Sequence, residues 1–328
     1  MTFFDDVLGS ARGYATRAQL LDSGFSDREL RTGVRAGHLR RLRHGVYVLA
    51  AQHALLTPEQ QHVVLVRSVA DKLGPAVAIS HQSAAAVHGL AMFGVDLSAV
   101  HVTRLDGSAG RTEHGLVHHV GLVLPDDVEE IDGIRVMKAS RATVETSTLG
   151  SVESAIVLMD SALHREAATP EELAEVVHRM SGWQGARRAR YALSLADGRA
   201  ESPGESRSRY LFRRENLPVP DLQVPVLDDA GRVIGYSDFG WIEYRHLGEF
   251  DGKVKYGGIT GDPRSPQQIV LAEKKREDSM RSRLLGMSRW TWDEIDARRG
   301  RQTAQRVRSE MEQSRRLFTR GAVVIPLH

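Results

Sequence analysis

The stretch GYSDFGWIEYRHLGEFDGKVKY, residues 235–256, decides how the C-terminal third of the chain is organised. Two runs within and around it, 232–241 and 245–251, are rich in apolar and aromatic residues and are separated by a short polar break. This pattern predicts two neighbouring strands. Four ionisable residues lie on these runs or directly after them: Asp238, Glu249, Asp251 and Lys253.

Carboxylates at the ends of neighbouring strands predict a divalent-cation site. Side chains two residues apart on a strand share a face, so Glu249 and Asp251 are expected to point the same way. An extended backbone beyond Gly252 would bring Lys253 to that face as well. Three acidic groups repel one another unless a cation lies between them, and hard carboxylate oxygens suit Mg²⁺ or Mn²⁺. We therefore expect magnesium or manganese at Asp238 and the two acids of the second strand.

The same residues also have simpler structural explanations. Ser202 to Glu205 has the sequence SPGE, a capping box with proline at the first helical position, so Glu205 could serve the helix alone. Asp251 followed by Gly252 is a favoured hairpin-turn pair. Asp238 is harder to explain in this way, because strand interiors disfavour aspartate.

The segment from Glu201 to Trp292 resembles the PD-(D/E)XK nucleases. More closely, it resembles the small nuclease-like domain related to very-short-patch-repair endonucleases, whose elements follow the order helix, three strands, helix, strand. The corresponding segments here are SPGESRSRYLFRREN for the first helix, LQVPVLD, RVIGYSDFGW and RHLGEFDGK for the strands, QQIVLAEKKREDSMRSRLLG for the second helix and MSRWTW for the last strand.

The resemblance implies a magnesium-dependent endonuclease and the roles of its residues. Glu205 matches the helix carboxylate of the family and Asp238 its metal-binding aspartate. Glu249 and Asp251 match the acidic pair on the third strand, and Lys253 would stabilise charge on the scissile phosphate. The chain departs from the strict E-x-K motif, whose lysine would stand where Asp251 is found. Either D-G-K is the working D-x-K motif, or the lysine role is lost and the domain is an inert scaffold.

A second pattern, over residues 13–50, predicts a winged helix-turn-helix. Thr16 and Ser26 each begin a helix with a capping pattern, and Gly24 marks the short turn between the two helices. The runs HLRRLR and GVYVL then predict a β-wing. A winged helix places its second helix in the major groove and its wing on the backbone, so six arginines are expected to contact DNA. They are Arg28, Arg31, Arg35, Arg40, Arg41 and Arg43.

This N-terminal pattern resembles the winged helix of abortive-infection antitoxins of the type IV toxin–antitoxin class. The resemblance implies a regulator that binds its own promoter, with a nucleotidyltransferase-type toxin as the genetic partner. A winged helix that contacts protein rather than DNA is the alternative. The matching residues are Thr16, Gln19, Leu20, Arg41, Gly45, Val46 and Tyr47.

The sequence of residues 51–195 predicts an α/β region without an evident catalytic or binding motif. It resembles the connecting domain of antitoxin-like proteins that end in a nuclease-like domain. His81 and His88 are seven residues apart in a predicted alanine-rich helix and so share a face. No nearby carboxylate completes a metal site, so a buried or interface pair of histidines is the expectation.

Composition and length set the overall class. The chain has 328 residues, 41% hydrophobic and 26% charged, which is ordinary for a globular protein. It has no cysteine, which excludes disulfides and thiolate metal sites. We expect a cytoplasmic location and no membrane partner. The predicted fold is α/β and multi-domain, with a winged helix over 1–50, a connecting domain over 51–195, a restriction-endonuclease-like domain over 196–300 and a basic tail over 301–328.

Two functions follow from these patterns. The first is a DNA-binding protein with a metal-dependent endonuclease domain, active in defence against phage or mobile elements. The alternative is an antitoxin and autorepressor whose nuclease-like domain is inert. The arginine-rich tail is either a second DNA contact or an ordinary surface helix. DNA and a cognate toxin or operator are the expected partners, and a dimer is compatible with a winged helix.

Overall fold

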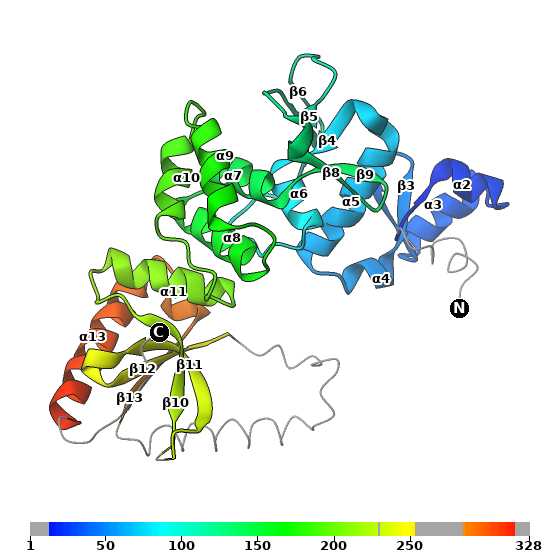
Figure 1. Ribbon diagram of the computed structural model, residues 1–328. Helices are drawn as coiled ribbons and strands as arrows, with labels where there is room; N and C mark the ends of the chain where they lie inside the picture. Colours follow the sequence, from blue (N-terminus) through cyan, green and yellow to red (C-terminus); the bar gives the residue numbers. More distant parts are fainter. Residues whose placement is uncertain (1–12, 229, 253–284, 319–328) are drawn as a thin grey trace. The chain divides into compact units, whose positions relative to one another are not determined.

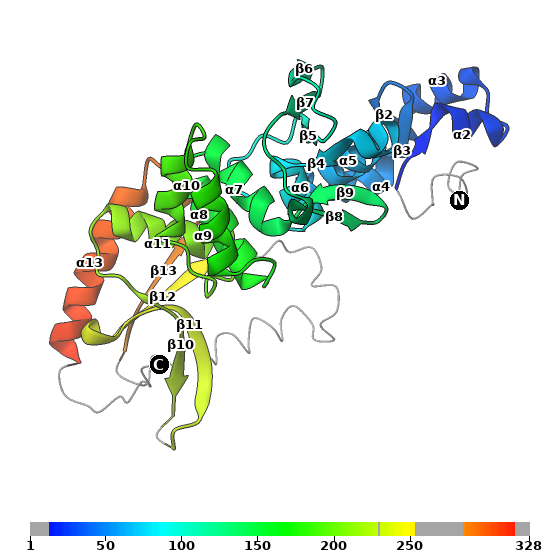
Figure 2. The same ribbon diagram turned by 45° about the horizontal axis from the view of Figure 1, so that its top comes forward.

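The computed structural model describes residues 13–228, 230–252 and 285–318, and the chain forms two compact units, Met1–Ser194 and Leu195–His328. Both units combine helices with sheets, so the fold is mixed α/β (Figures 1 and 2). No helix within the described residues is long and apolar enough to cross a membrane. Lys253 and most of the predicted helix 267–286 lie outside the described residues.

The described part of the first unit, from residue 13 on, begins with two short helices and a three-stranded sheet, an arrangement compatible with a winged helix. Thr16 and Ser26 cap the helices through the predicted capping boxes. Leu20, Leu30 and Leu39 form the buried core between helices and sheet. The elements are β1 (Ala15–Thr16), α2 (Arg17–Asp22), α3 (Asp27–Arg35), β2 (Leu39–Arg43) and β3 (Val46–Leu49), with the strand order β1-β3-β2.

A six-stranded mixed sheet follows, with the strand order β6-β7-β5-β4-β9-β8. Valines and isoleucines such as Ile79, Val102 and Val136 fill its core. Strand β4 occupies residues that the sequence pattern did not assign to a strand, because it is only three residues long and precedes an alanine-rich helix. The strands are β4 (Val77–Ile79), β5 (Val100–Arg104), β6 (Arg111–Glu113), β7 (Leu116–His119), β8 (Val128–Ile131) and β9 (Ile134–Met137).

The rest of the described part of the first unit consists mainly of helices (Figure 1). Helix α7 is buried along nearly its whole length, which explains its short side chains. Gly185, before α10, lies so close to α7 that a Cβ atom would be 2.2 Å from the Thr148 carbonyl oxygen. The helices are α4 (Ala50–Ala54), α5 (Pro58–Leu73), α6 (His81–Val87), α7 (Ala139–Leu149), α8 (Val152–His164), α9 (Pro170–Arg179) and α10 (Ala186–Leu193), with short 3₁₀ turns at η1 (Gly74–Ala76) and η2 (Pro125–Asp127).

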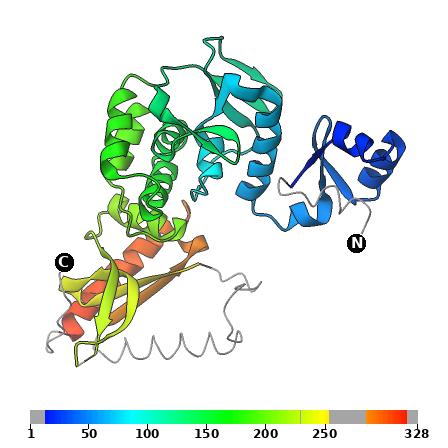
Figure 3. The same cartoon turned by 45° about the vertical axis from the view of Figure 1, so that its right-hand side comes forward.

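Within its described residues, the second unit has a four-stranded sheet with the order β10-β11-β12-β13, together with helices α11 and α13 (Figure 3). The first three strands are antiparallel, and β13 runs parallel to β12. Phe212, Trp241 and Trp290 form an aromatic core. The elements are α11 (Pro203–Arg214), β10 (Asp221–Leu227), β11 (Val233–Trp241), β12 (His246–Asp251), β13 (Gly286–Thr291) and α13 (Gly300–Leu317), with turns η3 (Ile242–Tyr244) and η4 (Trp292–Glu294).

Helix α13 differs from the expectation of a basic tail. Ala304, Val307 and Met311 are buried in the core of the second unit, so the helix is part of this fold. Its arginines obscured an apolar stripe at i, i+3 and i+7 spacing, which is typical of a helix packed on a sheet. Arg308 donates to the carbonyl oxygens of Glu215 and Asn216, an ordinary structural contact.

Candidate functional site

Exposed arginines lie on helix α3 and strand β2 of the N-terminal sheet. Leu30 and Gly33 bury the opposite face of α3, which fixes the orientation of the helix. Since DNA recognition depends on cations that water and phosphate can reach, these side chains form the candidate nucleic-acid interface. The exposed arginines are Arg28, Arg31, Arg35, Arg40 and Arg41.

Arg43 differs from the other predicted DNA contacts. It is half-buried, and its Nε donates to the Ser68 hydroxyl at 3.0 Å. Its Nη2 donates to the Ser68 carbonyl oxygen. A register shift between β2 and β3 after Arg41 accompanies this placement. Burial lowers the pKa of the Arg43 guanidinium. Arg43 therefore contacts α5, and we leave it out of the candidate interface.

In the second unit, a row of polar residues crosses the sheet. Phe239 on β11 pairs with Gly248 on the antiparallel strand β12. Asp238, which precedes Phe239, is therefore opposite Glu249, which follows Gly248, and both side chains lie on the other face of the sheet. Asp238 Oδ2 accepts a hydrogen bond from the Phe250 amide at 2.8 Å. Glu249 pairs in register with Arg289 on β13, and its Oε2 lies 3.7 Å from the Arg289 guanidinium. We call Asp238, Glu249 and Arg289 the sheet row.

Glu205 lies in the first turn of helix α11, whose N-cap is Ser202, and close to Asp238 of the sheet row. It accepts hydrogen bonds from the Ser202 hydroxyl at 2.6 Å, from the Glu201 amide at 3.0 Å and from Gln223 Nε2 at 3.0 Å. Burial raises the pKa of Glu205, and the negative charge of Asp238 raises it further against these hydrogen bonds. The predicted capping box forms only in part: the Ser202 hydroxyl accepts from the Glu205 amide, but the Glu205 carboxylate binds the Glu201 amide rather than that of Ser202.

Glycine at position 204 permits this proximity. A Cβ atom at Gly204 would lie 1.9 Å from the Phe250 ring, so only glycine lets the start of α11 approach β12 so closely. Asp251 is exposed at the end of β12. Within the described residues, these carboxylates do not form a group of three whose oxygens all lie within 4.8 Å of one another. The metal-binding role of Asp238, Glu249 and Asp251 stays a prediction.

The structure brings together histidines that the sequence pattern did not connect. His88 does not pair with His81; its Nε2 lies 2.8 Å from the Met137 carbonyl oxygen. His81, at the start of α6, instead meets His101 on β5 and His119 on β7, with potential ligand atoms all within 4.8 Å. We call these three residues the histidine cluster. No spacing in the sequence could reveal it, because its members come from elements that only the sheet order makes adjacent.

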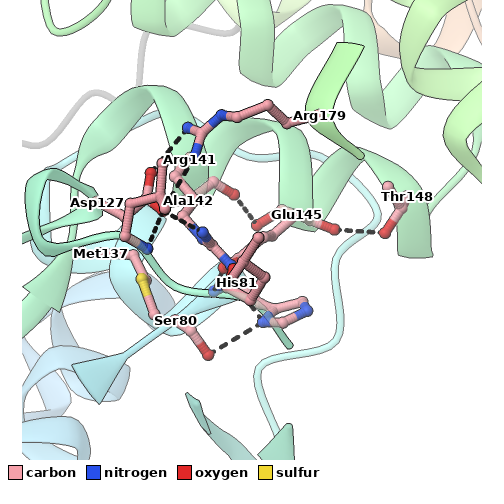
Figure 4. A network of polar contacts seen from close by, with 12 residues as sticks. Ser80, His81, Asp127, Met137, Arg141, Ala142, Glu145, Thr148 and Arg179 are labelled. Carbon is pink, nitrogen blue, oxygen red and sulfur yellow. Dashed lines mark hydrogen bonds and ion pairs between the residues drawn. The ribbon is translucent and has the colours of Figure 1, made fainter. Parts of the chain in front are cut away.

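Buried charges support the histidine cluster from one side (Figure 4). Glu145 is fully buried; it accepts a hydrogen bond from the His81 amide at 3.0 Å and one from Arg141 Nε at 2.8 Å. Arg141 also donates to Asp127, which Arg179 contacts at 2.8 Å. Every buried charge in this network has an opposite charge beside it, as burial requires.

Comparison with known proteins gives one family match, at the N-terminus. Residues 5–50 match the family described as "Transcriptional regulator, AbiEi antitoxin". Two proteins of Mycobacterium tuberculosis, uncharacterized proteins MT2308 and Rv2248, are each 30% identical over 172 residues, covering 51% of this chain and 62% of theirs. The match thus spans less than two thirds of these relatives. The crystal structure of the RV2827C protein from the same species has a TM-score of 0.38 and 15% identity, covering 63% of this chain and 80% of that one.

Proposed function

We propose that the chain is a DNA-binding transcriptional regulator of the antitoxin kind. The observation that carries this proposal is the agreement between the family match over residues 5–50 and the exposed arginines of α3 and β2. In this proposal α3 enters the major groove, where Arg28, Arg31 and Arg35 contact base edges or phosphates. Arg40 and Arg41 on the wing contact the sugar–phosphate backbone.

The test is binding of the full chain to the DNA upstream of its own gene, measured by fluorescence anisotropy over a series of salt concentrations. Replacing Arg28, Arg31 and Arg35 with alanine is expected to weaken binding at least about 100-fold, since a base contact contributes ~1–3 kcal/mol. It is also expected to lower the salt slope by about one for each phosphate that the variant no longer neutralises. A control removes the same charge from exposed arginines elsewhere in the first unit: Arg111, Arg187 and Arg190.

Equal losses of affinity in the two triple variants would refute the α3 interface, because only net charge would then matter. The regulated gene is expected to encode a toxin and to lie next to this one. Loss of repression in a reporter carrying the upstream DNA, seen with the α3 variant and not with the control, would link binding to regulation.

A second candidate function, metal-dependent DNA cleavage, rests on the sheet row and Glu205. The order of α11, three antiparallel strands and a parallel fourth strand supports a restriction-endonuclease-like fold for the second unit. Carboxylate oxygens of Asp238, Glu249 and Asp251 are the donors that Mg²⁺ or Mn²⁺ prefers, so these residues would hold the ion. The metal would polarise the scissile phosphate. The chain's own part is to position the acids.

The test is nicking of supercoiled DNA in the presence of Mg²⁺ or Mn²⁺. Asp238→Ala is expected to abolish cleavage, while Glu243→Ala, at an exposed acid of the same unit, is expected to leave it unchanged. Absence of cleavage by the wild-type chain on duplex and single-stranded DNA would eliminate this candidate and leave the regulator proposal intact.

A further inference from the structure

We propose that the histidine cluster, His81, His101 and His119, is a binding site for a divalent transition-metal ion of the zinc type. Each residue offers one ring nitrogen, and these atoms lie within 4.8 Å of one another. Three protein ligands with a fourth position left to water or another small ligand is a known zinc arrangement. The proposal concerns the middle of the first unit and does not depend on the proposed DNA-binding function.

The three rings already lie against one another. The His101 Nδ1 and His119 Nε2 atoms are 2.8 Å apart. The centroids of the His81 and His119 rings are 3.7 Å apart, and those of His81 and His101 are 5.7 Å apart. A tetrahedral ion with bonds of about 2.0–2.1 Å holds its ligand nitrogens roughly 3.3 Å from one another. Binding therefore requires the His101–His119 contact to open and the stacked His81 and His119 rings to tilt apart, so that the plane of each ring contains the ion.

The charge state of the cluster suits a metal. Burial lowers the pKa of His101 and His119 to about 4, and it lowers the pKa of His81 well below its usual range. Repulsion from His119 and His101 lowers the pKa of His81 further. All three imidazoles are thus neutral near pH 7, and each keeps a lone pair for a cation. Metal ligation requires neutral imidazole.

Polar groups hold the ring nitrogens of His81 and His101 that would not face the ion. The Ser80 hydroxyl lies 3.0 Å from His81 Nδ1, and Glu145 Oε2 lies 3.4 Å from the same atom (Figure 4). The Gln82 amide nitrogen, Nε2, lies 2.8 Å from His101 Nε2. Metal-binding histidines characteristically donate their second N–H to such groups, which fixes the ring. His81 Nε2 and His101 Nδ1 are left for the ion.

Gln82 can adapt to either state of the cluster. With a metal on His101 Nδ1, the ring proton moves to Nε2, and the Gln82 amide turns by half a rotation to present Oε1 as the acceptor. Among the described residues, Gln82 Oε1 has no hydrogen-bond partner in its present orientation. Rotation of the amide would give it one, at the cost of the 3.3 Å hydrogen bond from Gln82 Nε2 to the Asp96 carbonyl oxygen.

Access and ligand type identify the class of ion. His81 is buried, whereas His101 and His119 are only half-buried, so the cluster is reachable from the surface. Imidazole nitrogen favours Zn²⁺, Co²⁺, Ni²⁺ and Cu²⁺, whereas Mg²⁺ and Ca²⁺ prefer oxygen. The site is therefore expected to select against the ions that suit the sheet row.

His81 also has a backbone conformation that non-glycine residues rarely adopt. Its φ angle is +51°, in the left-handed region, and its amide donates to Glu145. Such conformations persist where the surroundings over-determine them, and they concentrate at functional sites. This conformation starts α6 and directs the ring of His81 toward His101 and His119.

The experiment is a Co²⁺ titration of the metal-free full chain, followed by visible absorption, with Zn²⁺ competition to obtain the zinc affinity. One equivalent of Co²⁺ with the strong absorption of a four-coordinate site is expected. His101→Gln and His119→Gln are each expected to weaken zinc binding at least about 100-fold, a larger effect than loss of a supporting residue. His114→Gln, at an exposed histidine near β7, is the matched control and is expected to bind as the wild type does.

Three results would overturn the proposal. They are absence of stoichiometric Co²⁺ or Zn²⁺ binding by the wild type, an equal loss in His114→Gln, and loss of the cobalt spectrum in Asp238→Ala, which would place the ion at the sheet row. Circular dichroism checks that the variants fold. If they do not, X-ray absorption of the zinc-loaded wild type decides, because imidazole ligands support the site and an all-oxygen shell refutes it.

Discussion

The sheet row of the second unit and the histidine cluster of the first unit are both groups of ionisable side chains, but they form in different ways. Asp238 and Glu249 come from one continuous stretch of sequence, and a single strand pairing makes them neighbours. The histidines come from α6, β5 and β7, and the order β7-β5-β4 brings them together. Side chains that meet within one hairpin can be predicted from their spacing in the sequence. Side chains that meet across non-consecutive strands can be predicted only when the strand order of the sheet is known.

The two groups also respond oppositely to burial. Burial raises the pKa of Glu205 beside the sheet row and lowers the pKa of the histidines, because in both cases it disfavours the charged form. Carboxylates that resist ionisation and imidazoles that resist protonation give opposite pH dependences. We expect acid to change the stability of the two regions most, and single substitutions to have progressively smaller effects.

Acid is expected to destabilise the first unit below pH 6.5. The pKa values of His62, His101 and His119 are lowered from 6.5 to about 4 by burial. The unfolded chain therefore takes up protons that the folded chain excludes, and stability is lost as the pH falls from 6.5 to about 4. Each histidine contributes at most about 3 kcal/mol, and the half-buried His101 and His119 less.

Hydrogen exchange at a series of pH values would measure this loss in peptides from β5 and β7. Peptides from α11 serve as the internal comparison, because the contribution of Glu205 to stability changes with pH in the opposite direction. The pKa of Glu205 is higher in the folded chain than in the unfolded chain. Glu205 therefore stabilises the fold at low pH, and this stabilisation is lost as the pH rises through the folded-state pKa. Equal acid sensitivity in both sets of peptides would contradict the contrast.

Glu145→Ala is expected to lower the free energy of unfolding by about 3 kcal/mol, because it removes a partner from the buried Arg141. It also leaves the His81 amide without its acceptor. Glu205→Ala is expected to cost only about 1 kcal/mol, because Ser202 remains as the N-cap and the substitution also removes a carboxylate whose charge burial disfavours. Urea unfolding of both variants measures the difference, and a larger loss in Glu205→Ala would reverse our ranking of the two regions.

Gly204→Ala is expected to destabilise the second unit by about 2 kcal/mol, because the added methyl group overlaps the Phe250 ring. Moving α11 away from β12 would also expose Glu205 to water. Gly252→Ala is the matched control, since its Cβ would meet the same ring at an ordinary 3.5 Å. Thermal unfolding monitored by tryptophan fluorescence distinguishes the two variants, and equal melting temperatures would rule out the close approach of α11.

Asp238→Asn is expected to change stability by less than about 1 kcal/mol, yet to lower the pKa of Glu205 by removing a nearby negative charge. The titration of the Glu205 carboxyl carbon, followed by NMR, measures this shift. Glu243→Gln, at an exposed acid, is the control. An unchanged titration in Asp238→Asn would mean that the two carboxylates do not interact, which would weaken the case for a shared cation.

Much of the fold was predictable because its signals are local. The capping boxes at Thr16 and Ser26 begin helices where the sequence indicates. The alternating runs of β10, β11 and β12 became strands. By contrast, β6 and β8 are short strands at the two edges of their sheet, with few buried side chains, so they carry no clear hydrophobic alternation.

The candidate sites were predictable only in part. The arginines of α3 are exposed as expected, but a register shift accompanies the turn of Arg43 toward Ser68. The neighbouring positions of Asp238 and Glu249 followed from strand pairing. The histidine cluster was missed because the sequence analysis paired His81 with the nearest histidine along the chain, His88. In the structure, His81 on α6 lies beside histidines from strands β5 and β7.

The parallel pairing of β12 with β13 has a consequence for the order in which the chain can mature on the ribosome. Parallel neighbours cannot be joined by a tight turn, so β13 pairs with β12 only after the connecting residues 252–285 have been synthesised. Trp290, at the centre of the aromatic core, and Val307 arrive later still. The first unit can therefore complete its folding while the second still exposes an unpaired strand edge, and this interval is when nascent chains are most vulnerable to aggregation.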